Sequence, residues 1–169
     1  MKMKSWLWNG MIAAAVALSA LSNVARAQTT DNNGCSNATL KGDYAFTVTD
    51  FSLQSFVVGL AQFDGNGKFT QVDYPASGLT NTPPVTDFRT GETGTYSVQE
   101  DCTGMGELDF NVGGKGAGHG VHYLAFVISN GGRSIRAVSA GFSPPGTTQL
   151  VPNQTRVDFW EVGSGRDDQ

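Results

Sequence analysis

Two histidines, His119 and His122, are the first residues in this sequence that could carry out acid–base or metal chemistry. Three positions apart on a β-strand, their side chains would point to opposite faces, so a shared metal site would require the strand to begin after His119. We therefore predict no metal site. Inside a barrel, His122 could act as a general acid or base. The alternative is an exposed or hydrogen-bonded histidine near a strand end.

Glu161 is the second candidate catalytic residue, because it falls in the same alternation as Val157 and Phe159. If that register continues, its carboxylate approaches the mouth or interior of a barrel. Desolvation there would raise the pKa of the carboxyl and suit it to proton transfer. The alternative is that the strand ends at this point and Glu161 reaches solvent.

Aromatic residues on the predicted inward faces of strands are the candidate ligand contacts. A tyrosine offers an apolar ring with one hydroxyl, which can orient a ligand. It can equally be a core aromatic whose hydroxyl bonds to the backbone. The candidate ligand-binding residues are Tyr44, Phe46, Tyr96, Phe126 and Phe159.

Motifs for cofactors and nucleophiles are incomplete in this sequence. The segment from Asp64 starts like a calcium loop, but its twelfth residue is Pro75 instead of glutamate. The glycine-rich run from Gly113 to Gly118 lacks the Gly-Lys-Ser/Thr of a phosphate loop, and Gly-x-Ser-x-Gly is absent. We predict no cofactor.

The first 27 residues have the three parts of a cleavable secretory signal. Lys2 and Lys4 precede a mostly apolar stretch, and Val24-Ala-Arg-Ala27 places small residues at a cleavage site. The alternative is an uncleaved anchor. No later segment has the roughly 20 apolar residues that a membrane span needs. The sequence therefore predicts a secreted or periplasmic protein.

Cleavage after Ala27 would leave 142 of the 169 residues, a usual size for one domain. It would also remove Lys2, Lys4 and Arg26, which leaves eight of the 11 basic residues against 15 acidic ones. This negative balance disfavours nucleic acid as a partner, because its phosphates attract basic surfaces. It also disfavours adhesion to anionic lipid.

Cys35 and Cys102 are the two cysteines of the sequence. In an oxidising compartment, two cysteines in a small domain usually pair, and we predict this disulfide. The bond would join the arm before the first strand to the turn after the fourth. The arm would then cross one end of the barrel as a plug.

Turn residues and alternating apolar residues after the signal predict an all-β domain. Most connections are short enough for neighbouring antiparallel strands. We therefore predict an eight-stranded up-and-down barrel over residues 28–162, followed by a flexible tail over residues 163–169. The predicted strands are Thr39–Phe51, Ser55–Asp64, Lys68–Tyr74, Glu92–Gln99, Met105–Val112, His119–Asn130, Ser134–Phe142 and Thr155–Val162.

Three stretches, Cys35–Tyr44, Phe63–Thr70 and Gly94–Gly104, carry a Leu-x-Gly-x-Tyr strand start and a Gly-Thr-Tyr…Asp-Cys-Thr-Gly hairpin. Together they resemble a group of secreted, mostly uncharacterised bacterial proteins. That group is similar in architecture to allene oxide cyclase-like and dirigent-like barrels, and more loosely to lipocalins. The cyclase family's catalytic residues do not match this sequence position by position, so the resemblance implies a scaffold.

The leading functional hypothesis is that the barrel binds a small, largely apolar molecule in an interior cavity. The first alternative is a cofactor-independent isomerase or cyclase that uses the same cavity to hold a flexible substrate in one reactive shape. The second alternative is an envelope or assembly protein with a filled barrel. Because the second, sixth and seventh predicted strands are apolar on both faces, association into a homo-oligomer is a further hypothesis.

Overall fold

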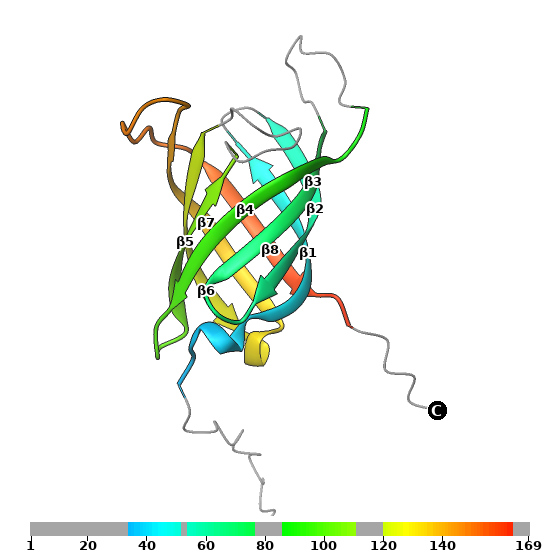
Figure 1. The fold of residues 1–169 in the computed structure, drawn as a ribbon, viewed down its shortest axis with the longest axis vertical. Helices are drawn as coiled ribbons and strands as arrows, with labels where there is room; N and C mark the ends of the chain where they lie inside the picture. The colour runs from blue at the N-terminus through cyan, green and yellow to red at the C-terminus, as the bar shows by residue number, and fades with distance from the viewer. Residues whose placement is uncertain (1–33, 52–53, 77–85, 111–119, 164–169) are drawn as a thin grey trace, which may run out of the picture. The chain divides into compact units, whose positions relative to one another are not determined.

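The computed structural model describes residues 34–51, 54–76, 86–110 and 120–163 (Figure 1). The chain divides into two units, Met1–Thr30 and Asp31–Gln169. The first unit, which holds the predicted signal, lies outside the described residues. So do His119, the run Gly113–Gly118 and the last six residues of the tail.

Eight strands form a closed barrel in chain order, each antiparallel to its neighbours, and β8 pairs with β1. This confirms the predicted fold and strand order. Most boundaries agree within two residues, while β4 begins three residues earlier than predicted and β5 ends three residues earlier. The strands are β1 (Lys41–Asp50), β2 (Ser55–Asp64), β3 (Lys68–Ala76), β4 (Arg89–Val98), β5 (Thr103–Asp109), β6 (Val121–Ser129), β7 (Ser134–Ser143) and β8 (Thr155–Glu161).

Alternate side chains along each strand point into the barrel, as β8 illustrates. Thr155, Val157 and Phe159 are buried, whereas Arg156 and Trp160 are exposed and Asp158 is half-buried. This period of two follows from the pleat of the strand. Buried apolar side chains from all eight strands meet in one core inside the barrel.

Three inward-facing glycines lie beneath phenylalanine rings. A Cβ added to Gly59, Gly94 or Gly104 would lie 2.2–2.3 Å from a ring atom of Phe46, Phe69 or Phe126 respectively. Because glycine has no side chain, each ring can lie directly against the backbone of a neighbouring strand. Glycines covered by aromatic rings are a known means of curving a sheet into a barrel.

The arm that precedes β1 closes one end of the barrel, at the bottom of Figure 1, which we call the lower end. The short 3-10 helix η1 (Asn37–Thr39) lies there, and Leu40, which follows it, is fully buried. The hydroxyl of Tyr96 donates to the carbonyl of Leu40 at 2.9 Å. The backbone N–H of Val98 donates to Oδ1 of Asn37 at 2.8 Å. These bonds tie the arm to β4.

The predicted disulfide between Cys35 and Cys102 is present, with 4.9 Å between the two Cα atoms. The backbone N–H of Cys35 also donates to the carbonyl of Glu100 at 3.1 Å. The arm is therefore fixed to the β4–β5 turn both covalently and by a hydrogen bond. Among the described residues, no helix is long and apolar enough to cross a membrane.

Candidate functional site

The lower half of the barrel interior is filled by aromatic side chains. The ring centroid of Phe63 lies 5.2 Å from those of Tyr44, Phe69 and Tyr96, and 6.0 Å from that of Phe159. The free space left among these rings and their neighbours is about 20 Å³. Ligand sites typically measure roughly 300–1,000 Å³. This half therefore has no room for a small molecule.

All five predicted ligand contacts belong to this aromatic core. Tyr44 and Tyr96 use their hydroxyls to bond to the backbone: Tyr44 donates to the carbonyl of Gly132 at 2.7 Å, and Tyr96 to that of Leu40. Burial, together with the charge of Glu161, raises the pKa of Tyr44 to about 12. Phe46, Phe126 and Phe159 are at most 8% exposed. In this packing, the five side chains are core aromatics.

The upper half of the interior is polar on the side formed by β3 and β4. A carboxylate–guanidinium cluster lies there, made of Gln71, Asp73, Arg89 and Glu92. The guanidinium of Arg89 binds both carboxylate oxygens of Asp73, with 2.6 Å between Nε and Oδ1. Gln71 donates from Nε2 to Oε2 of Glu92 at 2.8 Å. Nε of Arg89 lies 3.6 Å from Oε1 of Glu92.

The pairing of β3 with β4 brings these four residues together. Gln71 is the direct partner of Glu92, and Asp73 is the direct partner of Arg89. Two steps along β3 thus match three steps along β4, which is a β-bulge. Gly91 within it has a positive φ of 80°, a conformation that glycine adopts without steric cost. The bulge lets Arg89 and Glu92 face the interior together, although they are three residues apart.

Glu92 is the least solvated member of the cluster, at 1% exposed. Its Oε1 has no hydrogen-bond partner in the part of the chain that the structure describes. Burial and, next, the charge of Asp73 raise the pKa of Glu92 to about 6, against the opposing effects of Gln71 and Arg89. The site therefore contains a buried carboxyl whose pKa is raised and whose Oε1 accepts no hydrogen bond from the described residues.

His122 lies on β6 between the ring of Phe110, which directly follows β5, and the ring of Phe142 on β7. Its ring centroid is 5.1 Å from that of Phe110 and 4.6 Å from that of Phe142. The guanidinium carbon of Arg89 lies 5.4 Å from the centroid of Phe110, within the range of a cation–π contact. Phe110 thus contacts both the cluster and the half-buried His122.

Glu161 lies at the lower end, where its side chain is 41% exposed and 4.0 Å from Arg133. The structure therefore does not bring Glu161 together with His122, which lies toward the opposite end. The strand ends at Glu161, so its inward register does not carry the carboxylate into the core.

The sequence pattern did not identify the four residues of the cluster as a site, although the alternation along two strands already placed three of them inward. Gln71 and Asp73 alternate with Phe69 in the predicted third strand, and Glu92 alternates with Tyr96 in the fourth. Those spacings place all three on inward faces. Arg89 has no such signal, because it precedes the predicted strand and faces inward through the bulge.

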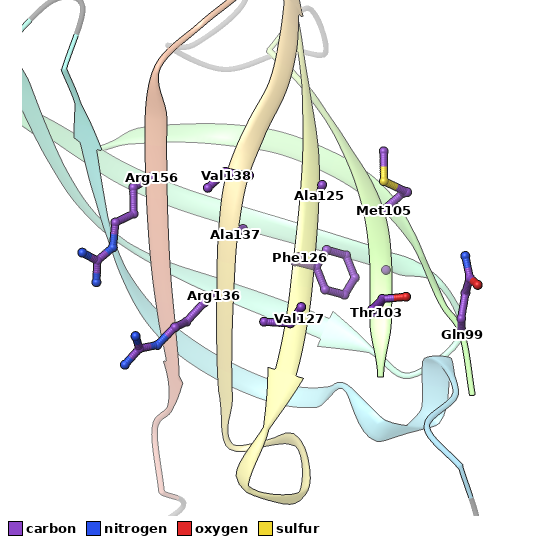
Figure 2. Close-up of a pocket in the computed structure, with 11 residues that line it drawn as sticks. Gln99, Thr103, Met105, Ala125, Phe126, Val127, Arg136, Ala137, Val138 and Arg156 are labelled. Atoms are coloured by element: carbon purple, nitrogen blue, oxygen red, sulfur yellow. The ribbon is translucent and has the colours of Figure 1, made fainter. Parts of the chain in front are cut away.

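Two larger hollows lie on the outer wall. One measures about 530 Å³ and spans neighbouring strands β5 to β8. Figure 2 shows Met105, Val127 and Val138 along it, with Arg136 and Arg156 at one side. The other, about 760 Å³, includes Lys41, Lys68 and Glu107. Both are open surface features. Within the described residues, no group of three or more His, Cys, Asp or Glu side chains could hold a metal ion.

The comparisons with known proteins concern the fold. No protein family and no curated protein match the chain. The solved structure of EF1p2_mFAP2b bound to DFHBI is similar, with a TM-score of 0.54 and 9% identity over 73% of this chain and 94% of that one. A de novo designed fluorescence-activating β-barrel gives a TM-score of 0.49 and 7% identity over the same shares. The first likeness supports the closed β-barrel; the resemblance to secreted bacterial barrels stays a prediction.

Proposed function

We propose that this protein binds a small molecule in the upper half of its barrel, outside the cytoplasm. The observation that carries the proposal is the buried Oε1 of Glu92, which has no hydrogen-bond partner among the described residues. An unsatisfied buried polar atom costs about 1–3 kcal/mol. A ligand that donates a hydrogen bond to this oxygen would offset that cost.

The walls of the same region supply apolar contacts for the rest of the ligand. Leu108 and Phe110 are buried there, and the rings of Phe110 and Phe142 flank His122. Val48 and Val57 are partly buried against the core on the opposite strands. A mostly apolar wall with a few convergent polar groups is typical of small-molecule sites. We therefore propose that the ligand contacts the side chains of the upper half and not the five aromatic residues of the core.

Two further observations are consistent with this proposal. Eight-stranded barrels have interiors that hold either side chains or one small ligand, and EF1p2_mFAP2b, which has a similar fold, was solved with DFHBI bound. The disulfide fits an oxidising compartment. We propose a secreted or periplasmic location on this basis and on that of the predicted signal.

Native mass spectrometry of protein purified from its own periplasm or medium tests the proposal. We expect the wild-type protein to carry a small-molecule adduct, Glu92→Gln to lose most of it, and Glu107→Gln to retain it. Glu107 is the matched control because it is a glutamate exposed on the outer face of β5. A wild-type protein without an adduct, or an adduct that Glu92→Gln retains in full, would contradict the proposal.

A second candidate function is cofactor-independent isomerisation or cyclisation in the same site. It is favoured by a specific observation: burial raises the pKa of Glu92 to about 6, and a group that titrates near the working pH is suited to general acid–base catalysis. An isomerase would release two compounds of equal mass that chromatography separates. A single bound compound that the wild-type protein leaves unchanged on incubation would favour the carrier.

A further inference from the structure

The charges of the carboxylate–guanidinium cluster do not balance. Asp73 and Glu92 supply two carboxylates, and Arg89 supplies one guanidinium. Arg89 is engaged by Asp73 through two hydrogen bonds and lies 3.6 Å from Glu92. Glu92 receives one neutral donor, the amide of Gln71. With both carboxyls ionised, the cluster carries one surplus negative charge beside Oε1 of Glu92.

Asp50 and His122 are two further titratable groups toward this end in the part of the chain that the structure describes. Asp50, at the upper end of β1, is 8% exposed and accepts a hydrogen bond from the hydroxyl of Thr155, so it adds another acid. His122 lies on β6 with its ring between Phe110 and Phe142. Among the described residues, Asp50, Asp73 and Glu92 thus place three carboxyl groups toward this end, beside the one guanidinium of Arg89.

Aromatic rings stand beside this acidic region. The guanidinium of Arg89 already lies over the ring of Phe110, and Phe142 lies on the far side of His122. The face of an aromatic ring attracts a cation. An anionic ligand would meet two carboxylates at low dielectric, where repulsion between like charges is strong. A neutral ligand would leave the surplus charge in place.

We propose that the ligand of this site is a cationic amine or amidine with an apolar body, whose N–H group bonds to Oε1 of Glu92. This inference rests on the proposed function, because it names the class of molecule that the upper half of the barrel would take. The cation supplies both the missing donor and the missing positive charge.

Three probes with the same aromatic body test this inference: 2-phenylethylamine, 2-phenylethanol and 3-phenylpropionate. Each is titrated to millimolar concentration into the exported, disulfide-bonded protein at pH 7.5, and binding is followed by amide chemical shifts in NMR. We expect the amine to bind about tenfold or more tightly than the alcohol, because both can donate a hydrogen bond to the carboxylate but only the ammonium adds attraction between opposite charges. The carboxylate should bind weakest, and the shifted amides should lie in β3, β4 and β6.

Two variants separate the role of Glu92 from general folding effects. Glu92→Gln should bring the amine's affinity to that of the alcohol and leave the alcohol's affinity within about twofold, while Glu107→Gln should keep the full preference. Equal binding of amine and alcohol by the wild-type protein, with shifts in the upper half, would overturn the amine inference and leave the proposed function intact. If none of the three probes shifts upper-half amides, both are overturned.

Discussion

Glu92 shows how its surroundings set the chemistry of a single residue. Burial favours its protonated form, so the pKa is raised in the folded protein to about 6 from an ordinary 4.5. Because the folded state binds this proton more tightly than the unfolded state does, Glu92 contributes most to the stability of the fold at low pH. This contribution is complete below about pH 4.5 and is lost as the pH rises through 6.

We predict that Glu92→Gln removes this pH dependence. Between pH 4.5 and pH 7, loss of the Glu92 proton should lower the wild-type free energy of unfolding by an amount on the order of 2 kcal/mol. The variant should lack this decrease. Urea unfolding at both pH values measures the difference. Glu107→Gln should follow the wild type, because its carboxyl is exposed; an identical pH response in Glu92→Gln and wild type would contradict the prediction.

Two buried glycines of β5 differ in what a methyl group would meet. A Cβ at Gly104 would lie 2.2 Å from Cζ of Phe126 and 2.6 Å from the carbonyl oxygen of Ser97. At Gly106 the nearest atom, the carbonyl oxygen of Thr95, would be 3.6 Å away. Gly104→Ala should therefore lower the free energy of unfolding by about 1–3 kcal/mol through overpacking. Gly106→Ala should change it by less than about 1 kcal/mol, and comparable losses in denaturant titrations would argue against this reading.

At this scale, the sequence contained the inward positions but not their roles. Alternation correctly placed Tyr44, Phe46 and Phe159 inside, and hydropathy could not tell a filled interior from a hollow one, because both need apolar inward faces. Arg89 could not be placed, since its direction depends on the bulge at Gly91. The pairing of Arg89 with Asp73 arises from a contact between strands, which local periodicity does not encode.

At the scale of elements, the arm and the β4–β5 turn behave as one unit. The disulfide and the hydrogen bonds from Tyr96 and Val98 hold the arm across the lower end. Replacing both Cys35 and Cys102 with serine should cost about 2–4 kcal/mol. The barrel strands keep their own ladders without this bond, so the arm should loosen first.

Hydrogen exchange measures this order of events. In the double variant, the amides of Thr39 and Leu40 should exchange faster under conditions in which those of Phe46 and Leu124 remain protected. The wild-type protein before and after reduction provides the same comparison without a substitution. Loss of protection in the arm and in the strands together would show that the disulfide stabilises the whole barrel cooperatively.

At the scale of the molecule, strand order was predictable because hairpin connections are short. Asp64-Gly-Asn-Gly67 joins β2 to β3, and Asn130-Gly-Gly132 joins β6 to β7. Short turns force sequential strands to be neighbours. The pairing of β1 with β8 was inferred from strand number alone, and the structure confirms it.

The outer wall leads to a prediction about assembly. On β2, Phe56, Val58 and Leu60 are 60%, 50% and 40% exposed. Such a row of exposed apolar side chains is typical of an interaction surface. We expect light scattering after size exclusion to give a mass above that of one chain, and Val58→Asp to lower it. Thr70→Asp on the outer face of β3 is the control, and a monomeric wild-type protein would refute the prediction.

Both ends of the described chain emerge at the lower end of the barrel. Cys35 is bonded to the β4–β5 turn, and the backbone N–H of Val162 donates to the carbonyl of Asp43 at the start of β1. Glu92 and His122 lie toward the other end, because they stand near the starts of β4 and β6. A tether fused to either end would therefore hold the protein by its closed base. On a sensor chip, such a molecule would stand with the end that holds Glu92 and His122 facing the flow.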